Sequence, residues 1–136
     1  MTARRRARIL AMVGVLLGGA VAAPGCAVAC PAIAYISTVV IDARAVADVV
    51  SMQVCIESEC TPEPGEEADP MSLLGVERLD DGTWNAVLDT RTPDRLTVRL
   101  YDGSGLLLRD TVEQVEWTFT GGACPGPASA STVVLG

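Results

Sequence analysis

Apolar and polar residues alternate along most of the chain with the period of two that is typical of half-buried β-strands. Segment 95–101 is the clearest case, because Leu96, Val98 and Leu100 share one face and more polar residues share the other. Similar patterns predict strands at residues 34–42, 49–56, 73–79, 83–88, 95–101, 105–119 and 129–135, the sixth being one long strand or two shorter ones. About seven short strands indicate an all-β fold, an immunoglobulin-like β-sandwich over residues 33–136.

Aspartate and glycine residues between these segments predict tight turns. Asp81 precedes Gly82 and Asp102 precedes Gly103, and this dipeptide is a strong hairpin signal because glycine accepts a positive φ. We therefore expect Asp80, Asp81 and Asp102 to shape turns rather than to carry chemistry.

Large apolar residues on the inward faces of the predicted strands form the expected core. Trp84 and Trp117 fall on those faces, and we expect them to pack in the core rather than to bind a ring-shaped ligand. Phe119 continues the face of Trp117. In segment 49–56, Cys55 alternates with the apolar residues, so we expect it off the core face, at the rim of a sheet.

The N-terminal residues have the pattern of an export signal. Four arginines within residues 4–8 precede an uncharged apolar run at residues 9–23, and Pro24 and Gly25 end this run. The run is shorter than the roughly 20 residues that a permanent transmembrane helix needs. We therefore predict that residues 1–25 form a signal peptide and that the rest of the chain is exported.

Cys26 determines how the exported chain is attached. It follows the small residues 23–25, and together they resemble a bacterial lipobox. The resemblance implies that signal peptidase II cuts before Cys26 and that a diacylglyceryl group on its sulfur anchors the chain to the membrane, with residues 26–32 as a tether. Signal peptidase I could instead cut after the Ala-x-Ala site at residues 27–29 and release a secreted protein, and an uncut signal would leave a retained anchor.

Cysteine pairing is compatible with either cleavage. The sequence has five cysteines, and removal or lipidation of Cys26 leaves Cys30, Cys55, Cys60 and Cys124, which allow three connectivities. Cys55 and Cys60 flank a short polar turn, which favours a local disulfide and leaves Cys30 to pair with Cys124. Small exported domains commonly use disulfides, whereas these spacings lack the C-x-x-C pairs of a zinc site. We therefore expect disulfides and no metal.

Composition narrows the function classes. Residues 26–136 hold six arginines and 17 acidic residues, a net charge of −11, and the chain has no lysine. This charge does not suit nucleic acid as a partner, and an aromatic content of 4% argues against stacking platforms for bases. The absence of histidine excludes Ser-His-Asp and Cys-His catalysis. With no other pair of nucleophile and base to name, we expect no enzyme activity and no cofactor.

One acidic segment is a candidate ligand site. Residues 61–70 contain three prolines and the four acidic residues Glu63, Glu66, Glu67 and Asp69. Hard cations such as calcium bind clustered carboxylates, but the segment lacks the spacing of a calcium-binding loop. We expect a solvated surface loop, and a secreted ligand- or cation-binding module is the alternative function.

Four short motifs give nearly the whole chain a family resemblance. They are Cys-Pro-Ala-Ile-Ala-Tyr at residues 30–35, Val-Cys at 54–55, Asp-Gly-Thr-Trp at 81–84 and Gly-Gly-Ala-Cys-Pro-Gly-Pro at 121–127. With them the chain resembles small uncharacterised lipoproteins of high-GC Gram-positive (actinobacterial) bacteria. The resemblance implies an Ig-like β-domain at the outer face of the cell membrane and brings no known activity. The expected function is a non-catalytic interaction or accessory module with an extracellular protein partner.

Overall fold

The computed structural model describes residues 29–136, which form β-strands and no helix. The strands are β1 (Thr38–Asp42), β2 (Ser51–Ile56), β3 (Glu59–Cys60), β4 (Leu74–Arg78), β5 (Trp84–Leu88), β6 (Arg95–Tyr101), β7 (Leu107–Gln114), β8 (Trp117–Phe119), β9 (Ala128–Ala130) and β10 (Val133–Val134). The predicted all-β class is confirmed. The predicted signal peptide, residues 1–25, and Cys26 lie outside the described residues.

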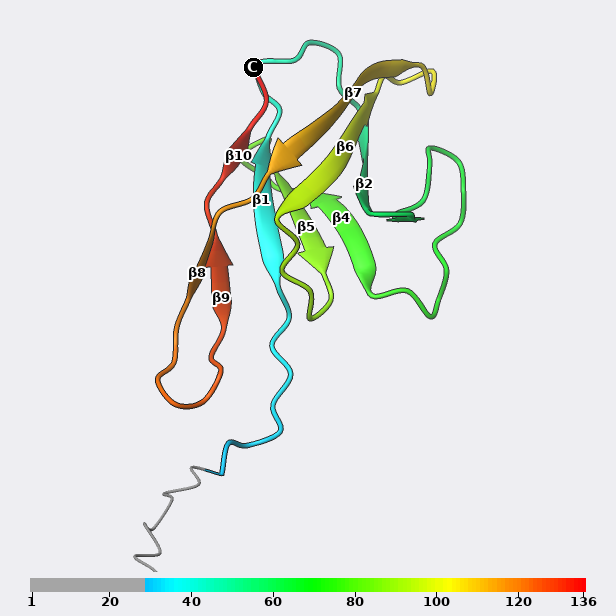
Figure 1. Ribbon diagram of the computed structural model, residues 1–136. Coiled ribbons are helices and arrows are strands. Elements are labelled where there is room, and N and C mark those ends of the chain that lie inside the picture. Colours follow the sequence, from blue (N-terminus) through cyan, green and yellow to red (C-terminus); the bar gives the residue numbers. More distant parts are fainter. Residues whose placement is uncertain (1–28) are drawn as a thin grey trace, which may run out of the picture.

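Two four-stranded sheets form the body of the molecule (Figure 1). The first sheet has the order β10-β1-β5-β4 and the second has the order β3-β2-β6-β7. Neighbouring strands are antiparallel except β1 and β10, which run parallel. A separate hairpin of β8 and β9 extends beyond the body, at the same end where the segment that leads into β1 leaves it (Figure 1).

The core lies between the two sheets and uses every second residue of most strands, as in a β-sandwich. The largest fully buried side chains are Ile41, Leu88, Leu96, Leu100, Leu135, Val39, Val54 and Val98. Each buried leucine stabilises the fold by about 1.5–3 kcal/mol through its removal from water. Trp84 is only 7% exposed, so its predicted place in the core is confirmed.

Three predicted strands differ most from the structure, whereas the other four differ by at most two residues at an end. Residues 34–37 lie outside the sheets, because β5, the neighbour of β1, ends where Ser37 makes the last backbone hydrogen bonds. Segment 105–119 contains two shorter strands, β7 and β8, which is one of its two predicted forms. Segment 129–135 is also divided, because β9 pairs with β8 whereas β10 pairs with β1.

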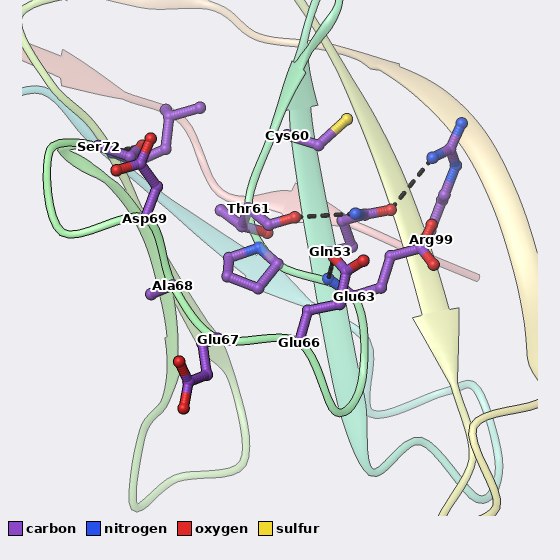
Figure 2. A pocket seen from close by; sticks show the side chains of 12 residues that line it. Gln53, Cys60, Thr61, Glu63, Glu66, Glu67, Ala68, Asp69, Ser72 and Arg99 are labelled. Carbon is purple, nitrogen blue, oxygen red and sulfur yellow. Dashed lines mark hydrogen bonds between the residues drawn. The ribbon is translucent and has the colours of Figure 1, made fainter.

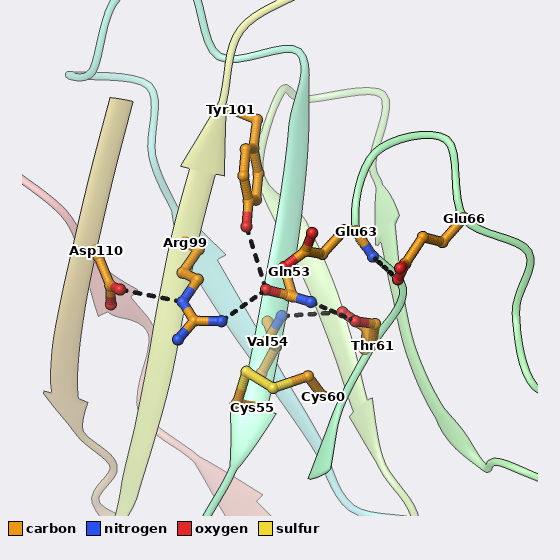
Figure 3. The surroundings of a disulfide bond; sticks show 10 residues. All are labelled: Gln53, Val54, Cys55, Cys60, Thr61, Glu63, Glu66, Arg99, Tyr101 and Asp110. Atoms are coloured by element: carbon orange, nitrogen blue, oxygen red, sulfur yellow. Dashed lines mark hydrogen bonds and ion pairs between the residues drawn. A yellow bond between two sulfur atoms is a disulfide. The ribbon is translucent and has the colours of Figure 1, made fainter. Parts of the chain in front are cut away.

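The outer face of the second sheet differs most from expectation. Alternation placed Cys55 at an accessible rim, but Cys55 is 2% exposed, and Gln53 and Tyr101 on the same face are 3% and 7% exposed. Gln53 is enclosed by its partners Thr61, Arg99 and Tyr101, and Cys55 is cross-linked to Cys60, while the chain at Thr61 runs beside β2 at the edge of the sheet (Figure 3). The period of two identified the face correctly, but it cannot show which side chains and segments exclude water from that face.

The β8–β9 hairpin places its two aromatic residues in different surroundings. Trp117 is half-buried against the core, and its Nε1–H donates to the Pro93 carbonyl at 2.9 Å. Phe119, expected on the same inward face, is 66% exposed. The hairpin extends past the edge of the body (Figure 1), and of its strand residues Trp117 and Ala130 pack against the core.

Both predicted turns are present. The side chains of Asp81 and Asp102 each accept a hydrogen bond from the backbone N–H two residues later. In the first turn Gly82 has the expected positive φ, +83°. In the second turn the positive φ falls on Gly105, at +84°, and not on Gly103.

Candidate functional site

The described cysteines form two disulfides with the predicted pairing. Cys55 and Cys60 occupy facing positions of β2 and β3, with their Cα atoms 4.0 Å apart. Cys30 and Cys124 join the segment before β1 to the turn of the β8–β9 hairpin, with their Cα atoms 5.3 Å apart. All four thiols are therefore used for cross-links.

Gln53 is the centre of a buried hydrogen-bond network on the outer face of β2 (Figure 3). Its Nε2 donates to the Thr61 carbonyl at 2.8 Å. Its Oε1 accepts from Arg99 at 3.1 Å and from the Tyr101 hydroxyl at 3.2 Å. Arg99 also forms an ion pair with Asp110 on β7 at 3.0 Å. The network therefore links three strands to the beginning of the acidic loop at Thr61.

Thr61 holds the beginning of the acidic loop on the sheet. Its N–H donates to the Val54 carbonyl and its Oγ1 accepts from the Val54 N–H, both at 2.9 Å. Burial is the main cause that raises the pKa of Tyr101, so its hydroxyl stays a neutral donor at pH 7. Because these buried polar groups have partners within the protein, the network positions the loop rather than offering a reactive group.

A surface hollow of about 440 Å³ lies between the network and the acidic loop (Figure 2). It is lined by Gln53, Cys60, Thr61, Pro62, Glu63, Glu66, Glu67, Ala68, Asp69, Ser72, Leu74 and Arg99. Three lining residues carry a thiol or a hydroxyl, the commonest nucleophiles. Cys60 is in a disulfide, and the hydroxyls of Thr61 and Ser72 accept hydrogen bonds from the backbone N–H groups of Val54 and Leu74, at 2.9 Å and 3.2 Å. All three therefore have structural partners.

The four carboxylates of the acidic loop do not gather around one point. Glu66 accepts a hydrogen bond from the Glu63 N–H at 3.1 Å, and Asp69 accepts one from the Met71 N–H at 2.9 Å. Two of the four carboxylates thus shape the loop itself. Within residues 29–136, no three acidic or cysteine side chains are grouped so that they could hold a metal ion. The structure gives no support to the cation-binding alternative.

The carboxylates with clearly shifted pKa values also serve the fold. Hydrogen bonds from the Arg44 side chain and backbone lower the pKa of Asp42 to about 2. Hydrogen bonds from the residue two positions later, chiefly from its hydroxyl, lower the pKa of Asp81 and of Asp102. All three side chains are at the surface, and the two turn residues have the structural role that the sequence predicts.

The end of the molecule around the Cys30–Cys124 disulfide has a different character. We call residues 29–37 and 117–130 the neutral tip, because every acidic and arginine side chain after residue 26 lies between Asp42 and Glu116. Its exposed large apolar side chains are Ile33 (57% exposed), Tyr35 (37%), Ile36 (55%) and Phe119 (66%).

A second hollow, of about 280 Å³, lies between the two segments of the neutral tip. Its lining carries no charged side chain and consists of Ile33, Ala34, Tyr35, Ser37, Thr90, Thr92, Phe119, Pro125, Gly126 and Ala128. The sequence analysis missed this surface. The available signal was the absence of charge at residues 26–41 and 117–136, beside a strongly acidic middle.

Comparison of the chain with protein-family models, with curated proteins and with solved structures gave no match. Within residues 29–136, no helix is long and apolar enough to cross a membrane. The functional conclusion therefore rests on the geometry and the sequence of this chain.

Proposed function

We propose that this protein is a non-catalytic, lipid-anchored extracellular β-sandwich that acts as an interaction or accessory module at the cell surface. The cysteine pairing is the observation that carries the proposal. Four of the five cysteines form two disulfides, and the fifth, Cys26, directly follows the predicted signal peptide. Disulfides are typical of exported proteins, and a cysteine at the cleavage point is what lipoprotein processing requires.

The sheet order supports an immunoglobulin-like topology for this module. Taken in chain order, β1 to β7 would be strands B, C, C′, D, E, F and G, with D, E and B in one sheet and C′, C, F and G in the other. β10 occupies the position beside B that strand A has in that fold, but it comes from the C-terminal end of the chain and runs parallel to β1. The step from such a fold to a binding function is an analogy.

The bonding of the polar groups supports a non-catalytic role. Gln53 and Tyr101 are bound to each other in the buried network, and Cys60 is cross-linked. A nucleophile in an enzyme needs a base within hydrogen-bond reach and a substrate site beside it. The lining of the larger hollow offers structural bonds in place of that pair.

The outer strand β7 supports an interaction role. It is an edge strand of the second sheet. Its exposed apolar side chains are Leu107 (45% exposed) and Val112 (57%), and the turn before it adds Leu106 (63%). The turn before β7 lies at the far end of the body from the β8–β9 hairpin (Figure 1). A sheet edge with apolar side chains can pair with a strand or an apolar surface of another protein.

The anchor is tested by the intact mass and the N-terminal peptide of the protein extracted from membranes. We expect a chain that begins at Cys26 and carries a diacylglyceryl group. Cys26→Ser should release the protein into the medium, whereas the matched control Ala32→Ser should stay on the membrane. A lipid-free chain that begins at Cys30 would overturn the anchor and make the protein a secreted one.

A further inference from the structure

We infer that the neutral tip rests on the lipid bilayer and inserts Ile33 and Phe119 among the lipid headgroups. The inference deepens the proposed function and rests on it, because the lipid on Cys26 would bring this end of the molecule to the membrane. It identifies which surface of the protein faces the bilayer, and this surface determines the orientation of the whole sandwich relative to the membrane.

Chain length limits how far the tip can lie from the anchor. Cys26 and Cys30 are four residues apart. An extended chain spans at most about 3.6 Å per residue, so a lipid-bearing Cys26 lies within about 14 Å of Cys30. The Cys30–Cys124 disulfide joins that position to the hairpin turn, so both segments of the tip stay near the membrane.

The charge distribution fits a bilayer at this end of the molecule. The tip carries no charged side chain, whereas the residues from Asp42 to Glu116 carry the whole net charge of −11. A neutral surface can approach lipid headgroups without the cost of desolvating charges. The acidic body is repelled by anionic headgroups and is therefore held away from them.

The exposed side chains of the tip are of the kind found at membrane interfaces. Ile33 and Ile36 come from the segment before β1, and Phe119 comes from β8, yet all three are more than half exposed at one end of the fold. Tyr35 lines the same hollow as Ile33 and Phe119. Apolar side chains flanked by tyrosine are typical of interfacial insertion, and an uncharged apolar patch at the surface requires an explanation.

The hairpin turn satisfies backbone groups that would otherwise be costly near lipid. The Thr120 N–H and hydroxyl both donate to the Pro127 carbonyl, at 3.2 Å and 2.7 Å. The Gly126 N–H donates to the Thr120 carbonyl at 2.9 Å. A Cβ at Gly126 would overlap that carbonyl, so glycine permits the two sides of the turn to approach closely. The apolar side chains of the tip thus project from a backbone whose turn is hydrogen-bonded and held by a disulfide.

Tryptophan fluorescence of the membrane-extracted protein in vesicles tests the inference. Phe119→Trp places a probe in the tip, and Leu106→Trp places a matched probe at a similarly exposed position (63%) at the far end of the body. Each variant is reconstituted in phosphatidylcholine–phosphatidylglycerol vesicles with and without brominated acyl chains. We expect a blue shift and strong quenching for Phe119→Trp, and no quenching beyond that of the parent protein for Leu106→Trp.

Intact mass, measured on the same samples, separates the anchor from the orientation. A lipidated protein whose Phe119→Trp probe is quenched no more than the Leu106→Trp probe would overturn this inference and leave the anchor standing. A protein without lipid would overturn the anchor, and the inference with it. A concentration-dependent blue shift of Phe119→Trp in detergent, without quenching in vesicles, would show that a second copy of the chain covers the tip instead.

Discussion

The second sheet with its acidic loop and the neutral tip are each closed by a disulfide, but in opposite surroundings. Cys55–Cys60 lies within a β-ladder, and the Gln53 network beside it is bonded to the first residue of a loop rich in carboxylates. Cys30–Cys124 lies outside both sheets, among uncharged residues with exposed apolar side chains. The first cross-link supports packing that already exists, whereas the second joins two segments that the sandwich core hardly touches.

The comparison shows that the burial of a side chain depends on which groups surround it in the fold. The strand pattern alone does not decide it. On the second sheet, polar side chains are buried because each finds a partner there. In the tip, apolar side chains stay exposed because no part of the body covers them. The second sheet therefore buries polar side chains, whereas the tip exposes apolar ones.

Removal of the Cys30–Cys124 disulfide should give the largest effect, and the shorter Cys55–Cys60 disulfide is its comparison. Cys30→Ala with Cys124→Ala frees a loop of 94 residues in the unfolded chain and should lower the free energy of unfolding by about 4–5 kcal/mol in the chain-entropy model. Cys55→Ala with Cys60→Ala frees a loop of 5 residues and should cost about 2 kcal/mol in the same model. Urea denaturation measures both. The reverse order would mean that the tip is already loose in the folded protein.

Loss of the buried amide should come next. Gln53→Ala leaves the Tyr101 hydroxyl and the Thr61 carbonyl without their partner, so we expect a loss of about 2–3 kcal/mol in the free energy of unfolding. Asn85→Ala is the matched control, because this amide lies in the first sheet and makes one exposed contact with Glu77. The control should change stability by less than about 0.5 kcal/mol. Equal losses of stability for the two variants in urea denaturation would show that the network does not contribute to the free energy of unfolding.

A smaller, local effect is expected in the tip. Gly126→Ala forces the Thr120 carbonyl aside and should lower the local stability of the hairpin by about 1–2 kcal/mol. Gly122→Ala, where an added Cβ meets no atom within 4 Å, is the control. Amide hydrogen exchange should show faster exchange at residues 120 and 126 in the first variant only. Unchanged exchange there would contradict the close approach of Thr120 and Gly126 in the turn.

The pH dependence of Asp42 should be the smallest effect. Its pKa is lowered by Arg44 from 3.8 to about 2, so the folded state favours the carboxylate. The stabilisation is complete above the unfolded pKa and is lost as the pH falls towards about 2. Asp42→Asn should therefore unfold at a lower temperature than the parent at pH 6, with the difference vanishing near pH 2. A difference independent of pH in thermal scans would assign the effect to something other than this carboxylate.

The sequence by itself determined the features that depend on neighbours along the chain. Period-two alternation identified the core faces of β2, β5 and β6, because side chains of a strand must point to opposite sides. Aspartate–glycine pairs located two turns, because those residues favour turn geometry wherever they occur. The disulfide pairing followed from proximity, since Cys55 and Cys60 flank one turn and leave a single partner for Cys30.

Only the tertiary structure decided what covers each face. The burial of Gln53 depends on partners from Thr61 and from β6, and the exposure of Phe119 depends on a hairpin that extends past the body. The parallel pairing of β1 with β10 joins opposite ends of the chain. The physical reason is common to all three: alternation reports the direction of a side chain, whereas burial requires contact between segments that local residue order does not specify.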